Sequence, residues 1–157
     1  MSIPRIMSVD FFPQRFQMIS FYPADLPQFA KQFKFAGGRI RAMKLLNGNG
    51  DDPTLELLLS IRSISKSLSD RVERVRLRLR FVGVEEFRFQ KRPGTPSGRI
   101  SECKFGYFQN LFYVNFDAWG LPPGELPKVH DFRASDTYVG CRDLKWERIE
   151  LPPPKSR

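Results

Sequence analysis

RVRLRLRF, residues 74–81, alternates an arginine with an apolar residue at every step. Successive side chains of a β-strand point to opposite faces, so the alternation predicts a strand with one arginine face and one apolar face. A helix would scatter the arginines around its axis, because each residue turns by about 100°. The chain is therefore expected to hold a sheet that buries one face. The arginines of this stretch are Arg74, Arg76, Arg78 and Arg80.

The alternation continues beyond Gly83. Phe87 and Phe89 fall on the apolar phase, and Arg88 falls on the arginine phase. Two interpretations fit this pattern: a second strand after a tight bend, or one strand that continues with a bulge at Gly83. In both, Arg88 joins the predicted arginine face.

One helix is predicted, over residues 25–35. Asp25 is suited to the N-cap position, and Pro27 falls in the first turn, where a missing N–H costs little. The pair Gly37-Gly38 is the expected stop. Apolar residues recur at helical spacing, at Leu26, Phe29, Ala30 and Phe33.

Two hairpins are predicted on either side of the arginine strand. Residues 39–46 and 54–62 flank the turn-rich NGNGDDP, and the second of these segments alternates like a half-buried strand. In the later hairpin, a two-residue turn at Gln109-Asn110 puts only apolar pairs on one face, at 107:112, 105:114 and 103:116. A shift of one residue would destroy that separation, so the register is well defined.

These elements indicate an α+β fold with a predominantly antiparallel sheet of about six to eight strands and one main helix. We expect one domain over residues 1–151 and a flexible Pro-rich tail at 152–157. The first residues lack the apolar core of a secretory signal, and no stretch reaches the roughly 18 apolar residues of a membrane span. With only two cysteines, the expectation is a cytoplasmic protein that does not associate with membranes.

The formal net charge is +9, and residues 71–99 carry +6 of it with nine basic and three acidic residues. Arginine binds phosphate and carboxylate through two parallel hydrogen bonds, so the face formed by Arg74, Arg76, Arg78, Arg80 and Arg88 suits an acidic protein, RNA or DNA. An RNA-recognition sheet needs its stacking aromatics on the charged face. Here they share the buried phase, at Phe81, Phe87, Phe89, Phe105 and Phe112, which favours an acidic protein partner over nucleic acid. The alternative is an ordinary solvated face, balanced by Glu56, Glu85 and Glu86 on neighbouring strands, or a face partly covered by the helix.

Catalytic signals are weak, so an enzyme is the less favoured interpretation. The segment 118–137 is long and irregular, and it offers a possible loop site at His130, Asp131 and Asp136. No zinc-ligand spacing and no phosphate-binding glycine motif occurs in the sequence, so no cofactor and no metal are expected. Cys103 and Cys141 are expected to be structural thiols.

The run from TLELLLSIR at residue 54 to NFD at residue 117, with Phe81-Val82-Gly83-Val84 followed by Phe87, has a recognisable pattern. It resembles small bacterial β-rich immunity proteins of polymorphic toxin systems, and related families without known activity. The resemblance covers roughly residues 38–117 and depends on hydrophobic pattern. It implies a non-enzymatic protein that neutralises a toxin by binding it, and the +9 charge would repel a basic toxin.

Overall fold

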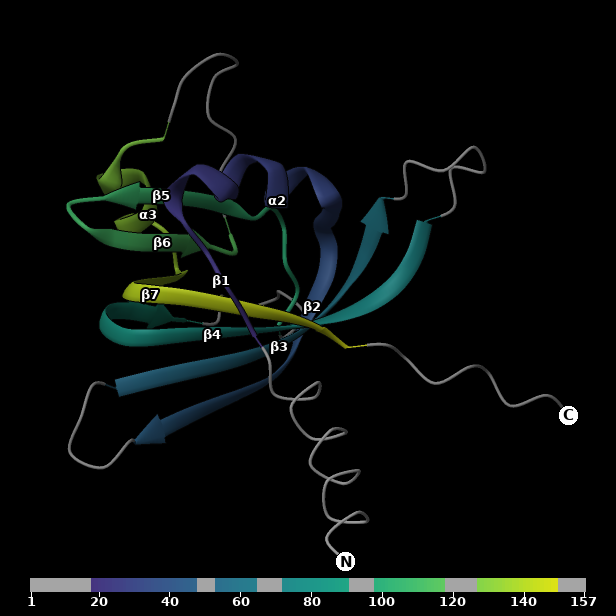
Figure 1. Ribbon diagram of the computed structural model, residues 1–157, viewed down its shortest axis with the longest axis horizontal. Helices are drawn as coiled ribbons and strands as arrows, with labels where there is room; N and C mark the ends of the chain where they lie inside the picture. The colour runs from purple at the N-terminus through teal and green to yellow at the C-terminus, as the bar shows by residue number, and fades with distance from the viewer. Residues whose placement is uncertain (1–17, 48–52, 65–71, 91–97, 118–126, 150–157) are drawn as a thin grey trace, which may run out of the picture.

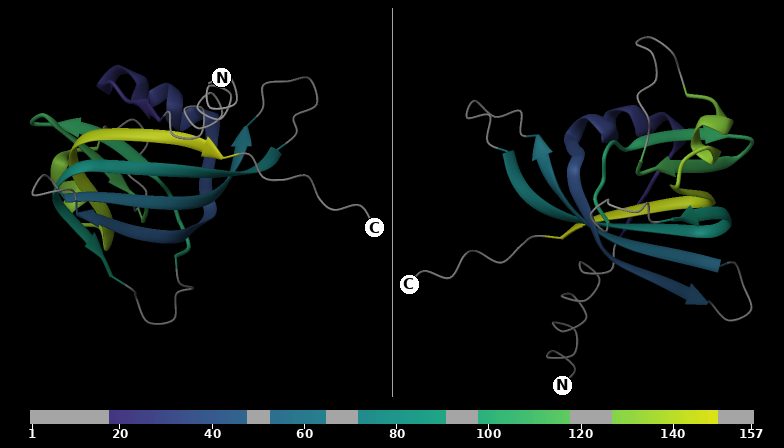
Figure 2. Two further views of the ribbon diagram at one scale, coloured as in Figure 1. Left: turned by 60° about the horizontal axis from the view of Figure 1, so that its bottom comes forward. Right: turned by 180° about the vertical axis from the view of Figure 1, so that it is seen from behind.

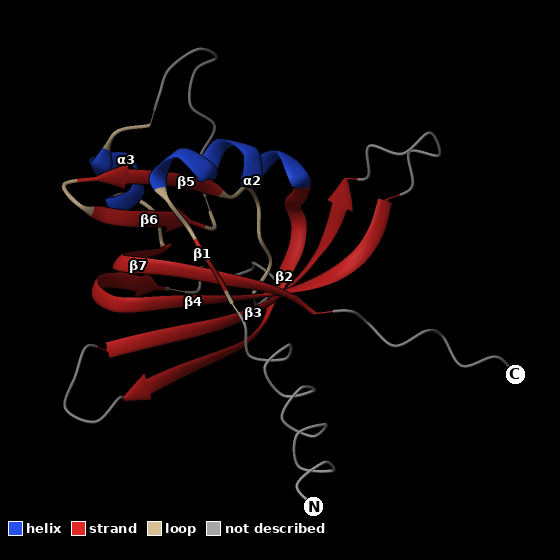
Figure 3. Ribbon diagram, in the orientation of Figure 1, coloured by secondary structure: helices blue, strands red, loops and turns tan. Residues whose placement is uncertain are grey.

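The computed structural model describes residues 18–47, 53–64, 72–90, 98–117 and 127–149. In these residues the fold is α+β, with seven strands in one antiparallel sheet, two short α-helices and one 3₁₀ turn, as the sequence predicts (Figure 3). The predicted tail at 152–157 and the first part of the irregular segment, residues 118–126, lie outside the described residues. In chain order the elements are β1 Ile19–Ser20, η1 Pro23–Asp25, α2 Leu26–Gln32, β2 Phe33–Asn47, β3 Pro53–Ile64, β4 Val72–Phe89, β5 Lys104–Phe108, β6 Leu111–Asn115, α3 Val129–Arg133 and β7 Thr137–Ile149.

The strand order is β2-β3-β4-β7-β6-β5, and the short β1 pairs with β7. The sheet is strongly curved, and α2 lies across one side of it (Figure 1 and Figure 2). The chain just before β5 returns to the opposite edge of the sheet, where it runs beside β2. There the N–H of Gly37 donates to the carbonyl of Ile100, and the N–H of Ile100 donates to the carbonyl of Gly38, each at 2.9 Å.

β4 confirms the alternation from which the sequence analysis started. Its apolar side chains Val75, Leu77, Leu79 and Phe81 are buried on the face of the sheet that packs beneath α2, which we call the inner face. We call the opposite face, which carries the arginines, the outer face. Strand β3 pairs with β4 on one side and with β2 on the other, both in antiparallel register, and the pairing of β2 with β3 confirms the predicted hairpin of residues 39–46 and 54–62.

β4 continues through Gly83 as one strand, which confirms the second interpretation, but the bulge lies just beyond Gly83 and not at it. Gly83 has φ +70°, a conformation that favours glycine, and one extra residue of β4 lies between Val84 and Glu86 relative to β7. Phe89 packs against the inner core, but Phe87 is 54% exposed, contrary to its predicted burial. β3 pairs with β4 only as far as Val82, so in the described structure Phe87 has β7 as its single strand neighbour.

The predicted helix 25–35 is wrong at its C-terminal end. α2 stops at Gln32, and Phe33 and Phe35 are buried on either side of the exposed Lys34, which is strand alternation. Both phenylalanines contact Phe29 of α2, so packing in the core overrides the local helical spacing. The Gly37-Gly38 pair lies inside β2 and does not end the helix.

Asp25 occupies the N-cap position of α2, but its carboxylate makes no capping hydrogen bond to that helix. The carboxylate instead accepts the backbone N–H of Tyr22 at 3.0 Å, which stabilises the preceding 3₁₀ turn.

The later hairpin has the predicted register, with Tyr107 opposite Phe112 and Phe105 opposite Val114. Gln109 and Asn110 form its turn, with φ of +52° and +65°. The ring of Phe105 packs edge-on against Phe29 at 5.5 Å between centroids, which joins the hairpin to α2 on the inner face.

A second, smaller apolar cluster covers part of the outer face. Phe132 of α3 is buried against Tyr113 of β6 and Tyr138 of β7. α3 therefore covers the outer face over β6 and β7, whereas the arginines in the first half of β4, from Arg74 to Arg80, lie beyond this cluster beside β3. Since α3 covers the outer face only over β6 and β7, the basic part of that face is the candidate binding site.

Candidate functional site

The register of β3 with β4 decides which side chains stand beside the predicted arginines. Along the outer face, Arg80 lies opposite Glu56, Arg78 opposite Leu58, Arg76 opposite Ser60, and Arg74 opposite Arg62. Directly opposite residues on one face have Cβ atoms about 5 Å apart, so their side chains interact. On β3, the residue beside the arginine face is therefore acidic at one end, at Glu56, and basic at the other end, at Arg62.

Arg78 and Arg80 are neutralised within the sheet. The guanidinium of Arg80 donates from Nε and Nη2 to one carboxylate oxygen of Glu56, at 3.0 and 2.8 Å. Arg78 forms ion pairs with Glu56 at 3.2 Å and with Glu147 of β7 at 3.0 Å. At Arg78 and Arg80 the structure therefore agrees with the alternative interpretation, in which Glu56 balances the charge of the arginine face.

The other end of the face has no such balance. The pairings of β2, β3 and β4 place Lys34, Arg62 and Arg74 side by side across three strands, and we call this set the cation ladder. The next row toward the middle of the sheet is Arg39, Ser60 and Arg76. In the described part of the chain, none of these five basic residues forms an ion pair. Like charges directly opposite each other destabilise a sheet, so the ladder has a cost in stability.

The cation ladder borders a hollow of about 410 Å³. We call it the basic hollow, because among the described residues that line it none is acidic and five are basic: Lys34, Arg39, Arg41, Arg62 and Arg74. Ser60 and the backbone of Gly37 and Gly38 also line it. The volume is within the range of about 300–1,000 Å³ that is typical of sites for small ligands.

The hollow forms where β2 departs from regular pairing. Between Lys34 and Arg39, β2 advances by five residues while β3 advances only from Arg62 to Ser60, so the extra residues form a bulge. Gly37 has φ +86°, and a Cβ on Gly38 would lie 2.7 Å from the carbonyl oxygen of Ser60. The two glycines therefore allow the positive φ and the close approach of the two backbones at this bulge.

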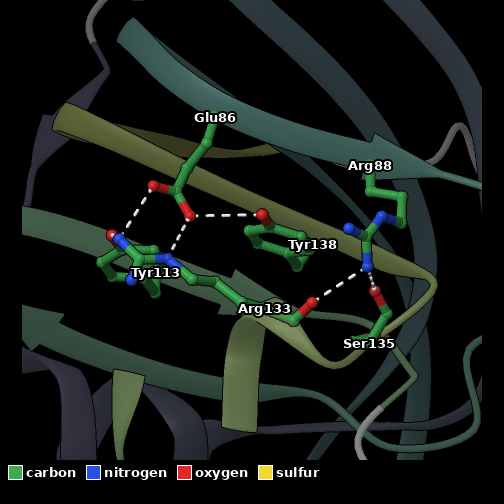
Figure 4. Close-up of polar contacts among 6 residues, drawn as sticks. All are labelled: Glu86, Arg88, Tyr113, Arg133, Ser135 and Tyr138. Atoms are coloured by element: carbon green, nitrogen blue, oxygen red, sulfur yellow. Dashed lines mark hydrogen bonds and ion pairs between the residues drawn. The ribbon is translucent and has the colours of Figure 1, made fainter. Parts of the chain in front are cut away.

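Arg88 lies on the outer face but is engaged with α3 (Figure 4). Its Nη1 donates to the carbonyls of Arg133 and Ser135 at 2.9 and 3.2 Å. Its guanidinium also lies 5.7 Å from the centre of the Tyr138 ring. These carbonyls are at the C-terminal end of α3, where a cation is favourable, so Arg88 holds the helix in place.

Next to Arg88, the carboxylate of Glu86 is surrounded by donors (Figure 4). Arg133 donates to it from Nε at 2.8 Å and from Nη2 at 3.1 Å, and the hydroxyl of Tyr138 donates at 3.2 Å. The hydrogen bond from Arg133 lowers the pKa of Glu86 below its usual value. Burial, followed by the charge of Glu86, raises the pKa of both Tyr113 and Tyr138. A saturated carboxylate and two weakly acidic phenols are poor proton carriers at neutral pH, so this cluster is suited to fixing α3 on the sheet.

The three residues of the possible loop site lie in α3 and just after it. The side chain of His130 is 73% exposed, and its Nε2 lies 3.5 Å from Oδ1 of Asp131. The other carboxylate oxygen of Asp131 accepts the N–H of Lys128 at 2.6 Å and so caps the start of α3. Asp136 is partly buried after α3, where its carbonyl accepts the N–H of Gln90. Among the residues that the structure describes, no group of three His, Cys, Asp or Glu side chains is arranged to hold a metal ion.

Both cysteines belong to the inner core. Cys141 is fully buried and its Sγ lies 3.2 Å from the carbonyl of Asp143, and Cys103 packs partly buried against the same core. Desolvation raises the pKa of both thiols, so they stay protonated and unreactive at neutral pH.

Sequence reasoning missed four of the five basic residues of the hollow. Arg62 was visible on the polar phase of its strand, and pairing residues 39–46 with 54–62 would have brought Arg39 close to Ser60. Lys34 was hidden because its segment was assigned to the helix. The position of Arg41 depends on a second irregularity in β2, for which the sequence carries no signal.

Comparisons with protein-family models, curated proteins and solved structures each gave no match to this chain. Among the described residues, no helix combines the length and the apolar character needed to cross a membrane. The case for a function therefore depends on the geometry of the basic surface.

Proposed function

We propose that this chain is a non-enzymatic cytoplasmic binding protein that engages an acidic protein through the open basic part of its outer face. We call this part the basic surface, and it consists of the cation ladder together with Arg39 and Arg76. The observation that carries the proposal is the contrast within one sheet: Arg78 and Arg80 have carboxylate partners, whereas the three cations of the ladder face one another.

An acidic protein is favoured over nucleic acid by the position of the aromatic rings. The two described aromatic side chains beside Glu86 and Arg88 on the outer face, Tyr113 and Tyr138, are buried beneath α3. Stacking of bases on aromatic rings supplies much of the affinity for single-stranded nucleic acid. The basic surface offers charge without such a platform.

The resemblance to immunity proteins of polymorphic toxin systems is compatible with this role. A protein of that kind acts by covering its target, and a positively charged surface would select a target with a negative one. On this proposal the cognate toxin, or any other partner, presents a cluster of Asp and Glu to the basic surface.

The test is the capture of partners from cell lysate by the tagged protein, compared with the variant Arg74→Glu/Arg76→Glu. We expect the variant to lose the partner, because two charge reversals repel an acidic surface. The matched control is Lys31→Glu/Lys128→Glu, which makes the same change in net charge at exposed positions of α2 and before α3.

Recovery of the same partners by Arg74→Glu/Arg76→Glu would overturn the proposal. Release of all captured material by nuclease would also overturn it, and would assign the basic surface to nucleic acid. Circular dichroism of both variants checks that the comparison is made between folded proteins.

A further inference from the structure

The basic hollow concentrates more positive charge than an ordinary acidic side chain would neutralise. Five basic side chains line it, and in the described structure no acidic residue does. Elsewhere on the outer face, carboxylates of the sheet accompany the arginines: Glu56 and Glu147 contact Arg78, and Glu86 contacts Arg133 of α3. The hollow is therefore the place where an external anion would most improve the electrostatic energy of the fold.

We propose that the basic hollow binds a phosphate monoester group, presented by a phosphorylated segment of the acidic partner. The inference rests on the proposed function, since it names the group on the partner that enters the hollow. A phosphate monoester carries a charge of about −1.5 to −2 at neutral pH and three acceptor oxygens. A carboxylate carries a single charge and two oxygens.

The types of side chain in the hollow match this ligand. Four of the five basic residues are arginines, whose planar guanidinium donates two parallel hydrogen bonds to phosphate oxygens. Arg62 has Lys34 on one side and Arg74 on the other, so three donors on adjacent strands reach a single anion. Arg39 and Arg41 of β2 also line the hollow. Recognition of phosphorylated motifs by clusters of arginine is a recurring mode of peptide binding.

The lining of the hollow distinguishes this ligand from a nucleic-acid backbone. Among the described lining residues there is no aromatic ring, so a base next to the phosphate would find no stacking surface there. A phosphodiester also carries only one charge per phosphate. The five cations that line the hollow therefore suit the higher charge of one terminal phosphate group better than that of a phosphodiester.

The site is also maintained at a cost to the sheet. Placing Lys34, Arg62 and Arg74 directly opposite one another is unfavourable without a ligand. Replacing Arg62 by an acidic residue would create two attractive pairs, and the chain does not have one there. Departures from local stability of this kind are expected at binding sites.

The experiment compares two acidic peptides of the same sequence, one with a phosphoserine and one with serine, by isothermal titration calorimetry on the full chain. We expect phosphorylation to tighten binding by about tenfold or more, because the phosphate adds negative charge and acceptor oxygens for charge-assisted hydrogen bonds with the arginines. In the variant Arg39→Gln/Arg62→Gln the two peptides should bind equally. Both substitutions reduce repulsion, so the variant is expected to fold.

The matched control is Lys44→Gln/Lys145→Gln, which removes two cations that flank Glu56 and Arg80 outside the hollow. This control should keep the preference for the phosphorylated peptide. Inorganic phosphate should compete with the phosphopeptide for the wild-type protein at millimolar concentration, whereas chloride at equal ionic strength should compete less.

Equal affinity of the wild-type protein for both peptides would overturn the inference while leaving the proposed function intact, provided that both peptides bind. Binding of neither peptide, together with unchanged lysate capture by Arg74→Glu/Arg76→Glu, would overturn both. A preference for phosphate that persists in Arg39→Gln/Arg62→Gln would place phosphate recognition outside the hollow and so also contradict the inference.

Discussion

Glu86 shows how a single carboxylate fixes one part of the outer face. It accepts three hydrogen bonds from two residues that are distant in the sequence, Arg133 and Tyr138, and its side chain is only 26% exposed. A Cβ on the neighbouring Gly140 would lie 2.9 Å from Cγ of Glu86 and 2.8 Å from the ring of Tyr113. The absence of a side chain at residue 140 is therefore required for the carboxylate to reach its donors.

The contribution of Glu86 to stability should depend on pH. Its pKa in the folded protein is below the usual 4.5, so the folded state favours the ionised carboxylate. The stabilisation is present above about pH 4.5 and is lost as the pH falls through the lower folded pKa. We therefore expect Glu86→Gln to unfold at a lower urea concentration than the wild type at about pH 7, with the difference shrinking toward about pH 3.

Urea titrations at several pH values measure this difference. Glu85→Gln is the control, because Glu85 is exposed next to Glu86 on the same strand. A gap between Glu86→Gln and the wild type that stays constant down to pH 3 would contradict the role given to the ionised carboxylate.

At the scale of elements, the sequence predicted what depends on alternation and missed what depends on irregular pairing. The faces of β3 and β4 and the register of the later hairpin follow from a two-residue period that one buried face imposes. The end of α2 and the bulge of β2 cannot be derived from that period. The sequence spacing of Phe33 fits a helix, whereas its packing in the core places it in a strand. The basic hollow depends on that bulge, so the positions of Lys34 and Arg41 could not be identified from the sequence, whereas Arg62 and Arg39 follow from strand alternation and the predicted hairpin.

Within β4, neighbouring arginines should differ in their effect on stability. Arg78→Gln removes the common partner of Glu56 and Glu147, whose side chains are only 18% and 14% exposed. We expect a loss of about 1 kcal/mol in the free energy of unfolding, because two partly buried carboxylates lose a donor. Arg76→Gln should change stability by less than about 0.5 kcal/mol, as is usual for an exposed residue without an ion pair.

Urea denaturation of the two variants measures this contrast. Equal losses would show that the ion pairs of Arg78 add nothing beyond the packing of its side chain.

The turn of the later hairpin offers a gain in stability. Gln109 and Asn110 both have positive φ, which Asn-Gly adopts more readily than Gln-Asn. The double substitution Gln109→Asn/Asn110→Gly should stabilise the protein by about 1 kcal/mol, because left-handed backbone is costly for most residues. Thermal unfolding measures the gain, and a lower melting temperature would contradict the turn geometry.

At the scale of the whole molecule, the net charge of +9 is distributed unevenly over the surface. Acidic partners neutralise the centre of β4 and the region beneath α3, whereas the cation ladder retains its charge. The sequence located an excess of +6 in residues 71–99, but part of that excess is balanced by Glu56 and Glu147 from outside the segment. Much of the unbalanced charge comes from β2 and β3, because strand pairing gathers residues that are far apart in the chain.

Because the positive charge is concentrated in the cation ladder, the stability of the protein should depend on salt concentration, and a single substitution in the ladder should change that dependence. Repulsion within the cation ladder is screened by salt, so the free energy of unfolding of the wild type should rise between about 20 mM and about 300 mM NaCl. Arg62→Glu places a carboxylate between Lys34 and Arg74 and should stabilise the protein by roughly 0.5 kcal/mol at low salt, a gain that declines as salt is added. Lys31→Glu changes the net charge by the same amount away from the ladder and should give no such gain. Urea titrations at both salt concentrations decide between a local and a global effect. Equal gains from Arg62→Glu and Lys31→Glu would show that the net charge of the protein, and not the cation ladder, limits its stability. A gain confined to Arg62→Glu would show that repulsion within the cation ladder lowers the free energy of unfolding of the wild-type protein.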